Sequence, residues 1–165
     1  MYDSFNFCAV ALGKGQNQIL LISVYRAPWA TSSDTKTLYD SLDSILTKFS
    51  RVVLVGDLNI NIPESYTSCY KHDFLQRLQS EHNLYQLAYV PTRGNALLDL
   101  VFVSSHFASS HIIDIPPVSD SDHSAQLITL PFNTFTERKT KKVINYEQLG
   151  FLLSQLNWQD LFFGC

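Results

Sequence analysis

The first part of the chain alternates apolar runs with polar turns. The apolar stretches Phe5–Leu12 and Ile19–Tyr25 flank a polar turn over residues 13–18 that contains two glycines. Two short apolar runs joined by a glycine-containing turn are typical of an antiparallel strand pair, so this pattern predicts a hairpin. Pro28 marks the end of the second strand, because proline restricts the residue before it and ends regular pairing.

A helix and a third strand follow the hairpin. Apolar residues recur at helical spacing from Leu38 to Phe49, and Ser32 and Ser33 are candidate N-caps. Immediately afterwards, the run RVVLVG predicts a buried strand that ends at Gly56. A strand, a helix and a strand in this order predict parallel pairing within a sheet that helices cover.

The second half of the chain continues the same mixture. Helical spacing predicts a helix over Lys71–His82, and apolar runs predict strands at Leu97–Val103, Ile112–Ile115 and Gln126–Leu130. We therefore expect an α/β fold with several strands of mixed direction.

The composition changes after Pro131. The run TERKTKK contains the four cations Arg138, Lys139, Lys141 and Lys142. Helical spacing of apolar residues returns after it. We therefore expect one domain over residues 1–131, a basic linker over 132–145 and the start of a helical linker over 146–165. The basic run either contacts a nucleic-acid backbone or is a solvated linker.

Composition limits the classes of partner. The chain has 165 residues, of which 45% are hydrophobic and 16% charged, and a charged fraction below the usual ~25% favours a buried sheet. The net charge of −3 means that any attraction for nucleic acid has to be local. Three widely spaced cysteines show no zinc-binding pattern and are expected to be free thiols. No apolar run reaches the roughly 18 residues that a membrane span requires, so no membrane contact is expected.

Polar residues stand at the ends of two buried strands. In VVLVGDLNIN, strand alternation places Asp57 and Asn59 on one face at the carboxyl end of a strand, where α/β sheets bind ligands. The same two residues also suit an ordinary turn. In LLDLVFV, Asp99 lies within an apolar run, where a carboxylate either has a partner or lies on an exposed edge.

Two further motifs carry chemistry. SDSDHS places Asp122 beside His123 before an apolar run. This pair suits a metal-holding carboxylate next to an imidazole that binds phosphate or takes a proton, and it also suits a plain polar loop. SVYRAP ends a strand with Tyr25 and Arg26. Their phenol and guanidinium suit phosphate, and the alternative is a strand-end aromatic with a solvated arginine.

Taken together, these side chains predict one site at the carboxyl edge of the sheet. Carboxylate and amide oxygens suit a hard cation, and a His–carboxylate pair suits the activation of water for attack on a phosphodiester. The sharpest expectation concerns Asp99 and His123: a carboxylate oxygen lies about 2.6–3.2 Å from an imidazole nitrogen.

The order of the motifs VYRAP, VGDLNIN, PTR…LLDLVFV and SDSDHSAQ resembles the endonuclease/exonuclease/phosphatase superfamily. Within it, the chain is similar over about residues 1–130 to the apurinic-type endonucleases of LINE-like (non-LTR) retrotransposons. The resemblance implies a four-layer α/β/β/α sandwich, of which this chain is the C-terminal part, and a metal-dependent phosphodiesterase that nicks DNA.

The resemblance also implies roles for individual residues. It implies catalytic roles for Tyr25, Asp57, Asn59, Asp99 and His123, metal binding for Asp122, and substrate binding for Thr92 and Ser121. The guanidinium chemistry described above adds Arg26 as a substrate-binding candidate. The cofactor that the resemblance implies is Mg²⁺ or Mn²⁺. The partners it implies are DNA and, in an intact element, a downstream reverse transcriptase. The location it implies is intracellular, and nuclear if the chain functions as a retroelement endonuclease.

The chain departs from the family pattern upstream of VYRAP, where the family has strands bearing an asparagine and the main metal-binding glutamate. The glutamates of this chain are Glu64, Glu81, Glu137 and Glu147, none of them upstream of that motif. We therefore expect a truncated domain without its N-terminal half, with weakened metal binding and impaired activity. Two alternatives remain open: an inactive or DNA-binding-only remnant, and another phosphohydrolase of the superfamily that acts on a phosphoinositide, sphingomyelin or an RNA tail.

Overall fold

The computed structural model describes residues 3–62, 69–131 and 154. The chain divides into two compact units, Met1–Pro131 and Phe132–Cys165. The basic run and the helical segment expected after residue 131 lie outside the described residues, apart from Ser154. Among the described residues, no helix is long and apolar enough to span a membrane.

The first unit is built on a five-stranded sheet with the order β1-β2-β3-β5-β4. The strands are β1 (Phe5–Leu12), β2 (Ile19–Arg26), β3 (Val52–Asp57), β4 (Leu84–Gln86) and β5 (Asp99–Ser104). The predicted hairpin is confirmed, because β1 pairs antiparallel with β2. The predicted crossover is also confirmed, because β2 and β3 run parallel. Both β3 and β4 pair antiparallel with β5, so the sheet is mixed.

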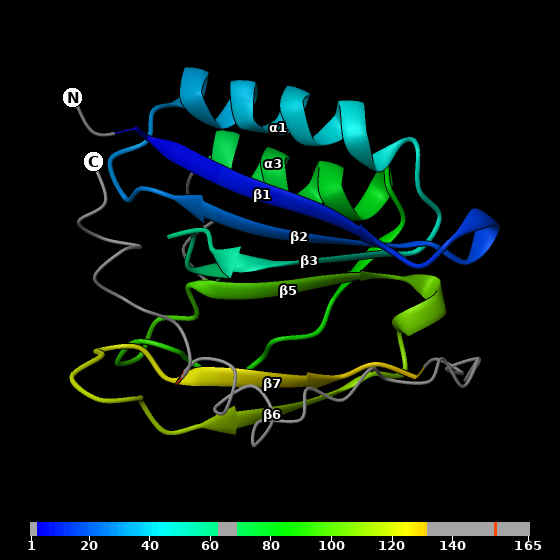
Figure 1. Ribbon diagram of the computed structural model, residues 1–165. Coiled ribbons are helices and arrows are strands. Elements are labelled where there is room, and N and C mark those ends of the chain that lie inside the picture. The colour runs from blue at the N-terminus through cyan, green and yellow to red at the C-terminus, as the bar shows by residue number, and fades with distance from the viewer. Residues whose placement is uncertain (1–2, 63–68, 132–153, 155–165) are drawn as a thin grey trace, which may run out of the picture. The chain divides into compact units, whose positions relative to one another are not determined.

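Two helices lie together on one side of this sheet (Figure 1): α1 (Ser32–Leu46) and α3 (Cys69–Ser80). The N-cap of α1 is Thr31 rather than Ser32 or Ser33. The Thr31 hydroxyl accepts the backbone N–H of Asp34, while the Asp34 carboxylate accepts the backbone N–H of Thr31. This reciprocal capping box satisfies two helix-end donors at once, which a serine cap alone would not do.

Strand alternation gives the sheet a helix face and a far face. On β2, the buried residues Leu20, Ile22 and Val24 share the helix face, whereas Leu21 and Tyr25 point to the far face and are exposed. The far face is therefore uncovered at β2.

Further along the sheet, the far face is covered. Val53 on β3 and Val101 on β5 point to this face and are buried. A separate two-stranded sheet of β6 (His111–Ile115) and β7 (Ala125–Thr129) lies away from the helices (Figure 1). Its residues Ile112 and Ile128 pack against the core. Both strands agree closely with the predicted apolar runs.

Candidate active site

Three neighbouring strands bring polar side chains together at one end of the sheet. Tyr25 is the register partner of Asp57 across β2 and β3, and Asp57 is the partner of Asp99 across β3 and β5. Directly paired residues point to the same face of a sheet, so all three side chains lie on the far face. Tyr25 remains 41% exposed there. The predicted meeting of strand ends is therefore present for these three residues.

Gly56 allows the backbone of β3 to lie very close to the backbone of β2, directly before Asp57. Its φ is +150°, and a Cβ atom added at this position would overlap the backbone of Val24. No residue with a side chain fits both the dihedral angle and the space. The glycine of the GDLN motif thus permits a close strand approach that sets the position of Asp57.

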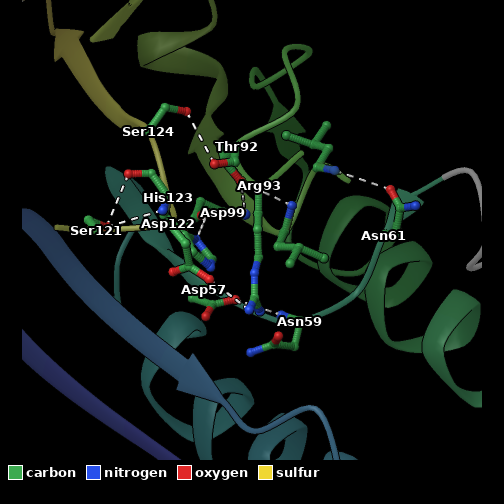
Figure 2. Close-up of polar contacts among 12 residues, drawn as sticks. Asp57, Asn59, Asn61, Thr92, Arg93, Asp99, Ser121, Asp122, His123 and Ser124 are labelled. Carbon is green, nitrogen blue, oxygen red and sulfur yellow. Dashed lines mark hydrogen bonds and ion pairs between the residues drawn. The ribbon is translucent and has the colours of Figure 1, made fainter. Parts of the chain in front are cut away.

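The Asp99–His123 pair has the expected geometry. His123 Nδ1 lies 2.7 Å from Asp99 Oδ2, and both side chains are partly buried. His123 reaches Asp99 from the connection between β6 and β7, which is distant in the sequence (Figure 2). Because an ionised carboxylate only accepts hydrogen bonds, Nδ1 is the donor in this contact, and Nε2 is the ring nitrogen that Asp99 does not engage.

Asp57, Asp99 and His123 form one cluster. One ligand-capable atom from each residue lies within 4.8 Å of those of the other two. Burial raises the pKa of Asp57, and the neighbouring charge of Asp99 raises it further, while the backbone N–H of Asn59 and the imidazole of His123 oppose the shift. An ionised carboxylate that is partly buried beside another one is stabilised by a cation. The two carboxylates therefore supply oxygen donors of the kind that fit a divalent metal.

Asn59 adopts a different conformation from the one that alternation predicts. The strand ends at Asp57, and Asn59 has a left-handed φ of 48°. Its backbone N–H donates to Asp57 Oδ1 at 3.0 Å, and its side-chain Nδ2 donates to the carbonyl oxygen of Arg26 at 2.9 Å. The expectation of extended strand at Asn59 was wrong, because local turn hydrogen bonds are stronger than strand continuation here. The same turn holds the Asp57 carboxylate in place.

Thr92 connects the two sides of the Asp99–His123 pair. This residue is only 3% exposed. Its hydroxyl oxygen accepts the backbone N–H groups of Leu98 and Asp99 at 3.3 and 3.2 Å. Its carbonyl oxygen accepts the backbone N–H of Ser124 at 2.8 Å. Thr92 therefore holds the start of β5 and the residue after His123 close together. Because its side chain is buried, its contacts position the Asp99–His123 pair and do not form an exposed binding surface.

Arg26 and Ser121 were both expected to bind substrate. Arg26 is fully buried, and its guanidinium donates to the Thr35 hydroxyl at 3.0 Å and to the Ala30 carbonyl at 2.8 Å. Substrate contact by Arg26 does not fit this burial, and the side chain instead ties β2 to the start of α1.

Ser121 is exposed, and its hydroxyl exchanges hydrogen bonds with the backbone N–H and carbonyl of His123 at 3.1 Å each. Ser121 therefore shapes the turn that carries His123.

Asp122 forms an ion pair that the sequence did not reveal. Arg93 Nη2 lies 2.7 Å from Asp122 Oδ2, and both side chains are more than half exposed. Figure 2 shows Arg93 extending toward the cluster of Asp57, Asp99 and His123. The signal for Arg93 was present in PTR, directly after Thr92. The guanidinium at this site thus comes from Arg93 and not from Arg26.

The fold and the comparisons agree on the class of protein. The chain is similar to the endonuclease domain of TRAS1, a telomere-specific non-LTR retrotransposon, with a TM-score of 0.63 and 17% sequence identity. The match covers 76% of this chain and 61% of that chain, and it shows that the molecule has an endonuclease-type α/β fold. No curated protein matches the chain. Residues 19–127 match the family model described as endonuclease-reverse transcriptase. The chain therefore belongs to the endonuclease-reverse transcriptase family, as its motifs indicated.

Proposed function

We propose that this chain carries the catalytic edge of a metal-dependent phosphodiesterase that nicks DNA, as part of a retrotransposon endonuclease. One observation supports this most directly: the Asp99–His123 hydrogen bond of 2.7 Å beside the Asp57 carboxylate. A histidine whose Nδ1 is held by a carboxylate presents Nε2 to a substrate in a defined tautomer. That arrangement suits proton transfer during water attack on phosphorus.

In this proposal the side chains of the site have the following roles. His123 Nε2 takes the proton of the attacking water or contacts the phosphate, and Asp99 stabilises the imidazolium that results. Asp57, with the adjoining Asn59, orients the water and the phosphate. Tyr25, exposed beside Asp57, donates a hydrogen bond from its hydroxyl to a phosphate oxygen.

Asp57 and Asp99 would hold a divalent metal such as Mg²⁺ or Mn²⁺ through their carboxylate oxygens, which are the ligands that hard cations prefer. When bound, the metal supplies a positive charge that stabilises the phosphoryl oxygens during hydrolysis. Asp122, the expected ligand, faces Arg93 instead. It would join the metal only after leaving that ion pair. A small set of protein ligands is consistent with weak metal binding by this chain alone.

The test is nicking of supercoiled plasmid with Mg²⁺, measured by conversion to the open-circular form. Because the structural match covers 61% of the TRAS1 endonuclease chain, the assay uses both the 165-residue chain and a fusion that adds the N-terminal half of a related element's endonuclease domain. We expect little nicking by the chain alone and robust nicking by the fusion. In the fusion, His123→Ala should lower the rate by at least ~100-fold, the usual contribution of general acid–base catalysis.

The matched control is His106→Ala, which removes an exposed histidine of the 3-10 helix Ser105–Phe107 outside the cluster and should leave nicking unchanged. Release of phosphate from inositol lipids without nicking would favour the other phosphohydrolase. DNA binding by a fusion that never nicks would favour the non-catalytic remnant. Equal loss of nicking in both histidine variants would contradict the role given to His123.

A further inference from the structure

Arg93 lies on a hydrogen-bonded turn beside the site. The backbone N–H groups of Thr92 and Arg93 donate to the carbonyl oxygen of Ala96 at 3.0 and 3.1 Å, and the N–H of Ala96 donates to the carbonyl of Arg93 at 2.9 Å. Gly94 within this turn has a left-handed φ of 56°. Since Thr92 is also buried and bonded on both sides, these hydrogen bonds fix the backbone of Arg93 beside the site and leave its exposed side chain to choose a partner.

The partner of Arg93 is easily exchanged. The side chains of Arg93 and Asp122 retain 53% and 65% of their exposure, and ion pairs between exposed groups gain little net free energy. A phosphodiester offers two non-bridging oxygens that share a negative charge, as the two oxygens of a carboxylate do, and guanidinium groups bind both in a bidentate way. Nucleic acid could therefore replace Asp122 at Arg93 at little energetic cost.

The charge balance of the chain singles out this arginine. The net charge is −3, and the site itself contains the carboxylates Asp57, Asp99 and Asp122. In the part of the chain that the structure describes, Arg93 is the one lysine or arginine whose charged end pairs with a carboxylate of the site. Arg26, the guanidinium that the sequence suggested, is buried and donates to backbone carbonyls and to the Thr35 hydroxyl.

We propose that Arg93 is a substrate-binding residue that contacts a DNA backbone phosphate beside the catalytic cluster, and that Asp122 holds the guanidinium ready in the absence of DNA. This inference rests on the proposed function for its choice of substrate. It assigns to Arg93 a role that the sequence suggested for Arg26, and it makes Asp122 a group that competes with the phosphate for the same cation.

The experiment measures binding and not cleavage. Fluorescence anisotropy follows a fluorescein-labelled DNA duplex titrated with the full chain, in EDTA and at several salt concentrations. We expect Arg93→Gln to weaken binding by roughly tenfold at low salt, the size of one charge-assisted contact. The slope of log affinity against log salt should fall by about 0.9, the value for one phosphate contact. Lys36→Gln is the matched control, because Lys36 is also an exposed cation in an ion pair, with Asp40 on α1.

The role of Asp122 is tested in the same assay. Asp122→Asn should tighten DNA binding when Arg93 is present and should do so much less in the Arg93→Gln background. The proposal is overturned by an unchanged salt slope in Arg93→Gln, by equal losses in the Arg93 and Lys36 variants, or by an equal Asp122→Asn effect in both backgrounds. Because no cleavage is measured, loss of nicking activity and loss of Arg93 binding are distinguishable outcomes.

Discussion

The surroundings of Asp57 destabilise the ionised form of its carboxyl group. Burial and the neighbouring charge of Asp99 raise its pKa, so the folded chain binds the Asp57 proton more tightly than the unfolded chain does. The contribution of this proton to the free energy of unfolding is fully present below the unfolded pKa of about 3.9, and it is lost as the pH rises through the folded pKa of Asp57. At neutral pH, ionised Asp57 therefore lowers the free energy of unfolding.

Replacing this carboxylate with a neutral group of the same shape should stabilise the metal-free protein. Asp57→Asn keeps a side-chain oxygen for the backbone N–H of Asn59 but carries no charge. We expect a higher Tm than the wild type at pH 7 in EDTA, with the difference vanishing below about pH 3.9. Thermal unfolding followed by circular dichroism across this range measures it, and a variant that melts at or below the wild-type temperature at pH 7 would contradict the assignment.

The reactive residues were predictable for different reasons. Asp99 and His123 could be recognised because a carboxylate inside an apolar run needs a partner, and the 2.7 Å contact confirms that partner. Arg26 was misread, although its parity with the buried residues Ile22 and Val24 on β2 already placed it on the helix face. Arg93 was missed because only the turn that closes on Ala96 directs it to the site, and a short sequence does not reveal that direction.

At the scale of elements, Gly56 controls the contact between β2 and β3. An added Cβ atom would overlap the backbone of Val24, and φ is +150°. We expect Gly56→Ala to lower the free energy of unfolding by roughly 3 kcal/mol, because neither backbone can yield without breaking sheet hydrogen bonds. Urea unfolding followed by tryptophan fluorescence measures this change.

Gly15→Ala is the control that separates the cost of the close strand approach at Gly56 from the cost of a positive φ. Gly15 also has a positive φ of 62°, but nothing lies within 4 Å of an added Cβ. Only the conformational cost remains, about 1 kcal/mol. If the two variants lose equal stability, the close strand approach at Gly56 has no energetic importance.

Elements with a full period of apolar residues could be predicted, and shorter ones could not. The pairing of β1 with β2 and the crossover to β3 followed from runs of six residues or more. In contrast, β4 has three residues, of which only Leu84 is buried, so it shows no alternation to detect. Its position depends on pairing with β5, a long-range contact that the local pattern does not encode.

At the scale of the whole molecule, two apolar sheet surfaces of the described part are open to solvent. On β1 and β2, the cross-strand partners Val10 and Leu21 are 48% and 38% exposed on the far face. On the two-stranded sheet, the cross-strand partners Ile113 and Leu127 are 56% and 51% exposed. The TRAS1 endonuclease chain extends beyond the part matched here. Clustered apolar side chains on strands with open edges promote association between molecules.

We therefore expect the isolated chain to self-associate, and we expect the pair Ile113 and Leu127 to contribute to it. The double variant Ile113→Thr/Leu127→Thr keeps residues suited to strands while removing this apolar contact, and it should shift the protein toward the monomer in sedimentation velocity. Val118→Thr is the control, because Val118 is 67% exposed but lies in the loop between β6 and β7, and it should leave the distribution unchanged. A wild-type chain that sediments as a stable monomer, or a control that disperses the protein as well as the double variant does, would show that these sheet surfaces are not the source of association.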